Sequence, residues 1–292
     1  MSGETTMHVD VNGISLLTRH VGNGPLVVVL HGGPGASHDY LLPQYDRLAN
    51  GRTLFYYDQR GGGQSPVPRE IPVGWREHVA DLEAIRVQLA LDRLTLSGYS
   101  WGGLLAVLYY LEYPERVGRL ALVAPASPTA QFRSQFERAL AERSNRPEIV
   151  RARDELRTSG LRDRDPAAYR RRAFELSVAG YFRDPRDAER LTPFRVIART
   201  QESVWNSLGE YDLRGRLRDT TSRLPPPPSR IIHGTYDPLP IAGSRELASI
   251  MNTELIELPT GHCPHVEATE EFVAALDAFL PAIKPGGDAV TP

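Results

Sequence analysis

Residues 94–104 read LTLSGYSWGGL, and they contain the pattern Gly98-x-Ser100-x-Gly102. An apolar run precedes this pattern and a helical run follows it, which is the setting of a sharp strand-to-helix turn that presents a serine nucleophile. Such a turn strains the serine backbone and requires small neighbours, which the two glycines supply. The pattern predicts Ser100 as a nucleophile. Because glycine and serine are common, an ordinary glycine turn is the alternative, and the rest of the chain must decide.

The composition is that of a globular protein. The chain has 292 residues, of which 41% are hydrophobic, enough to bury the core of one large domain or of a domain with an insertion. A formal net charge of −2 argues against a general nucleic-acid-binding protein. Cys263 is the single cysteine, so no disulfide can form within the chain, which fits a reducing compartment.

The beginning of the chain does not resemble a secretory signal, because residues 1–7 are polar and acidic and lack a basic segment followed by an apolar one. The longest strongly apolar run, Leu26–Leu30, is far too short to cross a bilayer. We therefore expect a cytoplasmic protein without a membrane partner.

Strand and helix patterns alternate along most of the chain. A hairpin signal, Asn12-Gly13, lies between two short strand patterns, and Leu26–Leu30 is apolar throughout, as expected of a strand buried on both faces. Trp75–Ala90 has apolar residues three and four apart, which predicts an amphipathic helix. Leu41–Ala49 is a short helix candidate. The alternation predicts an α/β fold, in which a mostly parallel sheet is flanked by helices.

The pattern of hydrophobic residues changes between residues 128 and 222. This segment lacks clear buried strands, favours helices such as Ala130–Arg143 and Pro166–Ala179, and holds 20 arginines against 15 acidic residues. We predict an inserted helical cap domain at 128–222, within a core domain formed by residues 1–127 and 223–292. The arginines are expected to form a solvated helical surface, with attraction of an acidic substrate as the alternative.

Two further side chains complete a predicted catalytic triad. Asp237 and His262 each follow a predicted strand, and the order Ser, Asp, His along the chain is that of serine hydrolases built on open parallel sheets. Because the carboxyl ends of parallel strands meet at one edge of a sheet, Ser100, Asp237 and His262 are expected at the same edge. His262 would accept the Ser100 proton and later give it to the leaving group, and Asp237 would orient the imidazole.

Other residues that resemble functional groups fit structural roles better. His265 is the competing base, but we expect it to pack beside the site. Cys263 lacks a nucleophile turn and is expected to be a small buried side chain, and His233 is expected to end a strand. The histidines lack metal-ligand spacing, and Gly61-Gly62-Gly63 lacks the lysine of a phosphate-binding loop, so we predict neither a metal nor a nucleotide.

An oxyanion hole is predicted from the segment that follows Leu26–Leu30. It reads His31-Gly-Gly-Pro-Gly35, and a serine hydrolase of this type takes one backbone N–H from such a loop and one from the residue after the nucleophile. Gly33 and Trp101 are the predicted donors, since glycine lets the backbone approach the substrate closely.

Four segments resemble the proline iminopeptidase (prolyl aminopeptidase) family of the α/β-hydrolase superfamily. They are His31–Gly35 followed by SHDY, the segment YDQRGGGQS at 57–65, Gly98–Gly103, and Gly261-His262 followed by Glu267. The resemblance implies an α/β-hydrolase fold with an eight-stranded sheet, a helical cap between strands six and seven, and no cofactor. It also implies the triad and the two oxyanion donors named above.

The resemblance further implies an aminopeptidase or amidase that acts on a small molecule or short peptide and holds the substrate's free amine with acidic side chains. Asn206 stands where the family has a glutamate, and Pro238 follows Asp237, so Glu202 and Glu210 are the candidates for amine binding. Trp205 is expected to line the substrate pocket, as are Tyr181 and Phe182, with packing inside the cap as the alternative for each. The alternative function is a carboxylesterase or lactonase with the same catalytic groups and no amine recognition.

Overall fold

The computed structural model describes residues 3–283, so the ends of the predicted core domain, residues 1–2 and 284–292, lie outside it. Its centre is an eight-stranded sheet in the order β1-β2-β4-β3-β5-β6-β7-β8, and every pairing from β4 to β8 is parallel. β2 pairs with β1 and β4 in antiparallel fashion. The strands are β1 Glu4–Val11, β2 Ile14–Gly22, β3 Leu26–Leu30, β4 Thr53–Tyr57, β5 Leu94–Tyr99, β6 Val117–Val123, β7 Ser229–Gly234 and β8 Glu254–Leu258.

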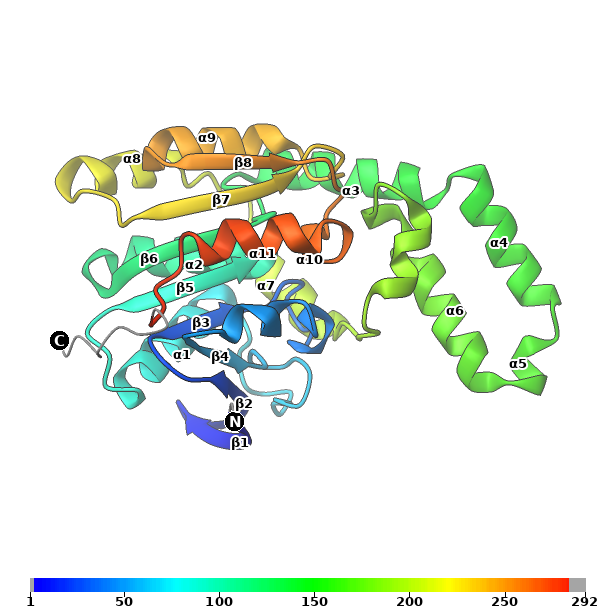
Figure 1. Cartoon of the computed structure of the whole chain (residues 1–292), viewed down its shortest axis with the longest axis horizontal. Coiled ribbons are helices and arrows are strands. Elements are labelled where there is room, and N and C mark those ends of the chain that lie inside the picture. The colour runs from blue at the N-terminus through cyan, green and yellow to red at the C-terminus, as the bar shows by residue number, and fades with distance from the viewer. Residues whose placement is uncertain (1–2, 284–292) are drawn as a thin grey trace.

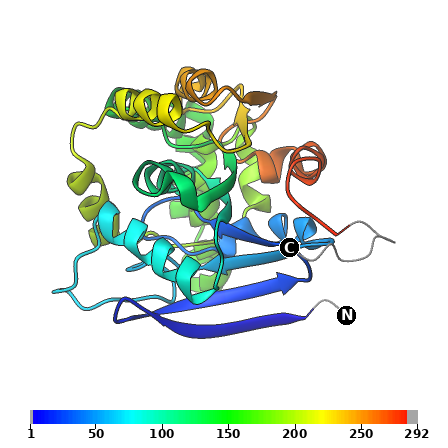
Figure 2. The ribbon, with the colours of Figure 1, turned by 90° about the vertical axis from the view of Figure 1, so that its left-hand side faces the viewer.

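Helices cover both faces of the sheet, with α1 and α2 on one side and α11 on the other (Figures 1 and 2). Alternation along β3 explains the two layers, because Val28 packs with α1 and α2 while Val27 packs with α11. The expected α/β fold is confirmed. The core helices are α1 Trp75–Gln88, α2 Trp101–Glu112, α9 Ile241–Met251, α10 Pro264–Glu267 and α11 Thr269–Asp277, with the 3-10 turns η1 Asp39–Leu41, η2 Tyr45–Ala49 and η3 Pro114–Arg116.

One expected helix is absent in its predicted form. The segment Leu41–Ala49 folds as the two short turns η1 and η2, separated at the cis Leu42-Pro43 bond. Proline has no backbone N–H and cannot continue a helical hydrogen-bond ladder, which accounts for the interruption.

Between β6 and β7 the chain forms several helices, of which α4, α5 and α6 lie beyond the carboxyl ends of the strands and project farthest from the sheet (Figure 1). Leu217 of α8 packs in the core cluster with α2 and α9, so this helix lies against the core. The division at 128–222 therefore stays a prediction. The elements are α3 Ala130–Ser144, α4 Pro147–Thr158, α5 Leu161–Arg164, α6 Pro166–Val178, η4 Ala179–Tyr181, η5 Pro185–Arg190, α7 Ala198–Leu208 and α8 Arg214–Arg223.

Candidate active site

The turn from β5 into α2 has the geometry that its sequence predicts. Ser100 has φ 53° and ψ −117°, a strained conformation for a residue with a side chain. A Cβ at Gly98 would lie 2.4 Å from the Gly102 carbonyl oxygen, and a Cβ at Gly102 would lie 2.1 Å from that of Leu30. Both positions therefore require glycine. The turn leaves Ser100 partly exposed at the carboxyl edge of the sheet.

Ser100, His262 and Asp237 form a hydrogen-bonded chain. The Ser100 Oγ lies 3.0 Å from His262 Nε2, and His262 Nδ1 lies 2.8 Å from Asp237 Oδ2. With the proton on Nδ1, the imidazole donates to the carboxylate and accepts from the hydroxyl, which is the arrangement a general base requires. The side chains of Asp237 and His262 are 0% and 5% exposed, so water competes little for this contact.

The loop after β7 holds Asp237 in place. Its Oδ1 accepts the backbone N–H of Leu239 at 2.7 Å. His233 is the penultimate residue of β7, and its ring lies between the Leu239 carbonyl oxygen, 3.0 Å from Nε2, and the Ser244 hydroxyl, 2.8 Å from Nδ1. Burial lowers the pKa of His233. The neutral ring of His233 thus supports the loop that carries the Asp237 carboxylate and adds no charge beside it.

The predicted oxyanion donors lie next to residues of the nucleophile turn: Trp101 follows Ser100, and Gly33 follows Gly32, where an added Cβ would lie 2.9 Å from the Ser100 Cβ. Gly33 lies in the loop after β3, where the neighbouring Gly32 N–H donates to Tyr40 Oη at 2.6 Å, and Trp101 is the first residue of α2. Within the described part of the chain, the backbone N–H groups of Gly33 and Trp101 donate to no protein group. The two donors are therefore available to a substrate oxygen.

Gln59 joins the two donor segments, a role that the sequence did not reveal. Its Nε2 donates to the His31 carbonyl oxygen at 2.8 Å, its Oε1 accepts the Trp101 indole N–H at 2.8 Å, and its backbone N–H donates to His31 Nε2 at 3.0 Å. Both side chains, Gln59 and His31, are buried. One amide side chain thus fixes both the loop of Gly33 and the start of α2.

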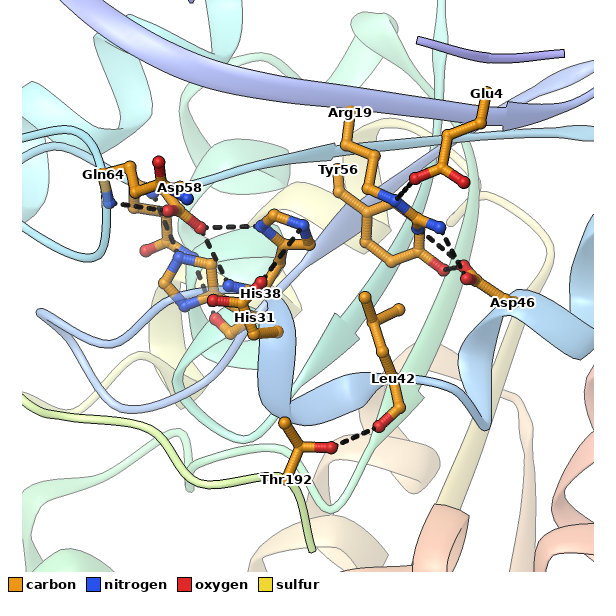
Figure 3. Close-up of polar contacts among 12 residues, drawn as sticks. Glu4, Arg19, His31, His38, Leu42, Asp46, Tyr56, Asp58, Gln64 and Thr192 are labelled. Carbon is orange, nitrogen blue, oxygen red and sulfur yellow. Dashed lines mark hydrogen bonds and ion pairs between the residues drawn. The ribbon is translucent and has the colours of Figure 1, made fainter. Parts of the chain in front are cut away.

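Asp58 holds the same loop through its hydrogen bonds to His38 (Figure 3). This fully buried carboxylate accepts the backbone N–H of His38 at 2.9 Å, the His38 Nδ1–H at 2.8 Å and the backbone N–H of Gln64 at 2.8 Å. Burial alone would raise the pKa of Asp58, but the hydrogen bonds from His38 and Gln64 outweigh it and lower that pKa. Nearby, Thr192 donates to the Leu42 carbonyl oxygen and connects the helical insertion to this region.

The loop that carries His262 is held by residues that follow α6. The backbone N–H of His262 donates to the Tyr181 carbonyl oxygen at 2.7 Å. The Glu267 carboxylate accepts the N–H of Gly261 at 3.0 Å and that of Arg183 at 2.9 Å, so one side chain joins the base loop to the insertion. A Cβ at Gly261 would lie 2.2 Å from the Tyr181 oxygen, which explains the glycine before the histidine. Burial raises the pKa of Glu267.

Aromatic rings surround the base and the oxyanion side. The rings of Tyr99, Phe136 and Tyr181 lie 5.4, 5.6 and 5.4 Å from that of His262, between centroids. Trp205 of α7 packs edge-on against Trp101 at 5.5 Å. The Tyr181 ring thus lies beside His262, and the Trp205 ring lies beside Trp101. Phe182 is fully buried and packs in the core, so it does not line the site.

Other predicted residues are placed as follows. Glu202 and Glu210 are exposed, and within residues 3–283 neither forms an ion pair. Cys263 is buried with its thiol 3.3 Å from the Tyr99 hydroxyl, and burial raises its pKa. His265 is buried among the rings of Tyr45, Tyr99 and Phe272, and burial lowers its pKa to about 3. His262, and not His265, contacts Ser100.

Comparison with known proteins identifies the family. The family model described as "alpha/beta hydrolase fold" matches residues 25–269. The proline iminopeptidase of Lactobacillus helveticus (strain DPC 4571) is 31% identical over 276 residues, which cover 88% of this chain and 90% of that protein. The chain belongs to the proline iminopeptidase family of α/β hydrolases. The resemblance seen in the sequence is confirmed, and the protein is a hydrolase.

Solved structures share the fold of this family member. A proline iminopeptidase from Mycobacterium smegmatis has a TM-score of 0.66 and 24% identity, over 94% of this chain and 97% of that chain. An enol-lactonase from Burkholderia xenovorans LB400 has a TM-score of 0.64 and 21% identity, over 94% and 99%. In residues 3–283, we find no helix long and apolar enough to cross a membrane.

Proposed function

We propose that this protein is a serine hydrolase that releases a small, proline-like N-terminal residue from a short peptide or amide. The contact between Ser100 Oγ and His262 Nε2, at 3.0 Å, carries this proposal. Its membership of the proline iminopeptidase family supports the choice of substrate. No cofactor enters the mechanism.

The reaction proceeds through an acyl-enzyme. Ser100 Oγ attacks the substrate carbonyl while His262 Nε2 accepts its proton, and Asp237 stabilises the imidazolium. The N–H groups of Gly33 and Trp101 bind the oxyanion, each contributing about 2.7–4 kcal/mol to the lowering of the barrier. His262 then protonates the leaving amine as the C–N bond breaks. Water, deprotonated by His262, then attacks the acyl-enzyme, the bond between the acyl carbon and Ser100 Oγ breaks, and His262 returns the proton to Oγ as the acid product leaves.

The side-by-side kcat/KM on prolyl and alanyl p-nitroanilides, with free and blocked amines, and on short p-nitrophenyl esters tests this function. Strong preference for the free-amine prolyl anilide supports the iminopeptidase activity, and turnover of esters alone contradicts it. Glu202 and Glu210 are the proposed amine-binding residues, and Trp205 the proposed pocket wall. Glu202→Gln is expected to reduce activity on amino-acid amides far more than on simple esters, whereas equal small losses would exclude that role.

A carboxylesterase or lactonase is the second candidate. The exposure of both Glu202 and Glu210 favours it, because a carboxylate open to water binds a substrate ammonium weakly. For either function, we propose that residues 128–222 form a cap over a core of residues 1–127 and 223–292. The cap supplies Phe136, Tyr181 and Trp205 to the site.

A further inference from the structure

Helix α3 packs against the candidate active site. Its Phe136 ring lies 5.6 Å from the His262 ring, and the guanidinium of Arg133, one helical turn earlier, lies 4.9 Å from the centre of the Trp205 ring. Trp205 in turn contacts Trp101, the residue that follows Ser100. Residues three apart share a helix face, so one face of α3 reaches both the Trp205 ring and the His262 ring.

Hydrogen bonds hold the start of α3 and thereby fix the position of this helix beside the candidate active site. The Ala130 N–H donates to the Tyr211 carbonyl oxygen at 2.9 Å, and the Leu213 N–H donates to the Pro128 carbonyl oxygen at 2.9 Å. The Tyr211 hydroxyl also donates to the Ser127 carbonyl oxygen at 3.1 Å. Arg133 therefore projects from a helix turn that is tied to the chain on both sides.

The guanidinium of Arg133 has N–H donors that no described residue accepts. Its Nε donates to Glu137 Oε1 at 3.1 Å, and among the described residues its Nη1 and Nη2 donate to none. The Arg133 side chain is 30% exposed and that of Glu137 is 57% exposed, so this pair is weak. A guanidinium stacked on an aromatic ring, with both terminal nitrogens free, is well suited to bind a carboxylate through two hydrogen bonds.

We propose that Arg133 binds a carboxylate of the substrate, so that the enzyme prefers substrates with a free carboxylate close to the scissile bond. This inference rests on the proposed function, under which the nearest such group is the C-terminal carboxylate of a dipeptide. Dipeptides are then better substrates than the corresponding dipeptide amides. The inference also assigns one arginine of the arginine-rich segment to substrate recognition, while the others form a solvated surface.

The ratio of kcat/KM for Pro-Gly to that for Pro-Gly-amide tests the inference. We expect this ratio to favour the dipeptide in the wild type and to fall roughly tenfold to 100-fold in Arg133→Gln, as expected for loss of charged hydrogen bonds. Arg133→Lys keeps the charge without the planar fork and gives an intermediate ratio. Glu137→Gln raises the ratio, because the competing carboxylate is removed.

Arg138→Gln is the matched control, since Arg138 is an exposed arginine on the same helix. It is expected to leave the ratio unchanged. Thermal unfolding and fluorophosphonate labelling of Ser100 verify that each variant is folded and has an intact nucleophile. A ratio that Arg133→Gln leaves unchanged, or that Arg138→Gln changes equally, overturns the inference.

A failure of the proposed function is distinguishable from a failure of this inference. If no prolyl substrate is turned over, the aminopeptidase activity is wrong, and the same variants are compared on 4-(butyryloxy)benzoate, whose carboxylate is on the leaving group, and on phenyl butyrate. A selective loss on the benzoate ester in Arg133→Gln would retain the carboxylate site within an esterase. Equal losses on the two esters would overturn it.

Discussion

The two sides of the candidate active site are supported in different ways. On the oxyanion side, Asp58 and Gln59 hold the loop of Gly33 and the start of α2 through buried hydrogen bonds within the core. On the base side, the loop of His262 is bound to the segment after α6, through the Tyr181 carbonyl oxygen and the Glu267 carboxylate. Buried core side chains thus hold the predicted oxyanion side, to which the insertion adds the Ile197 N–H donated to the Gly35 carbonyl oxygen at 2.9 Å, whereas the backbone of the His262 loop bonds directly to the segment after α6.

Removal of the Ser100 hydroxyl, which lies between the oxyanion side and the base side, should have the largest effect. Ser100→Ala is expected to lower kcat by at least roughly 10⁴-fold, as in other triad enzymes, because no other group replaces the nucleophile. Steady-state kinetics on the best substrate measures this, and Ser249→Ala, at an exposed position on α9, is the control. If Ser100→Ala kept more than trace activity with an unchanged fold, the triad assignment would be wrong.

The second prediction concerns the oxyanion side. Gln59→Leu removes the hydrogen bonds to the His31 carbonyl oxygen and the Trp101 indole, and it leaves both groups buried and unpaired. We expect kcat to fall roughly 100-fold, comparable to loss of an oxyanion donor, and stability to fall by about 1–3 kcal/mol. Chemical denaturation and kinetics report the two effects separately.

Gln64→Ala provides the comparison for Gln59, because the Gln64 side chain is exposed and only its backbone is used by Asp58. This variant should behave as wild type in both measurements. Normal kcat in Gln59→Leu would mean that the core does not need this amide to place the oxyanion donors, and the contrast between the two sides would disappear.

The third prediction concerns the base side and is smaller. Glu267→Gln keeps one oxygen acceptor for the N–H groups of Gly261 and Arg183 but loses the charge and the second oxygen. We expect kcat to fall roughly tenfold, since charged hydrogen bonds are worth about 1.5–3 kcal/mol and only part is lost. KM should change less than kcat, because the effect acts through His262.

Glu270→Gln is the control for this variant, because Glu270 is exposed and pairs with Arg47 at the surface. It should leave kcat unchanged. A loss in Glu267→Gln as large as that in Gln59→Leu would show that the inserted helices contribute as much to preorganisation as the core does.

The smallest expected effect is a difference in pH dependence. The folded-state pKa of Asp58 lies below its ordinary value of 3.8, so its stabilisation is complete above that value and is lost as pH falls through the folded pKa. The folded-state pKa of Glu267 lies above its ordinary value of 4.5, so stability is higher below pH 4.5 and decreases as pH rises through the folded pKa.

Denaturant unfolding between pH 3 and pH 7 separates these two signs. The stability difference between wild type and Asp58→Asn should shrink as pH falls below the ordinary pKa of the carboxylate. The difference between wild type and Glu267→Gln should instead shrink as pH rises. Parallel slopes for the two variants would contradict the assigned pKa directions.

The sequence predicted candidate residues on both sides of the site, and it did not reveal the Gln59 bridge on the oxyanion side. The glycine pattern around Ser100 and the order of Asp237 and His262 reflect local turn geometry and strand order, which the chain encodes in short segments. The helix expected at Leu41–Ala49 was wrong because Pro43 interrupts it. The YDQR segment was recognised as a family pattern, but the bridge that Gln59 makes between His31 and Trp101 depends on two strands meeting in space.

The sequence by itself determined the parallel α/β architecture, the nucleophile turn and the family, because strand periodicity, glycine requirements and short motifs are local properties. Only the tertiary structure decided that Phe182 is core while Tyr181 lies beside His262, that Glu267 reaches Arg183 across 84 positions, and that Arg133 stacks on Trp205. These contacts join segments far apart in the chain. Their partners are selected by the packing of helices on the sheet, which leaves no signal in the local pattern of either segment.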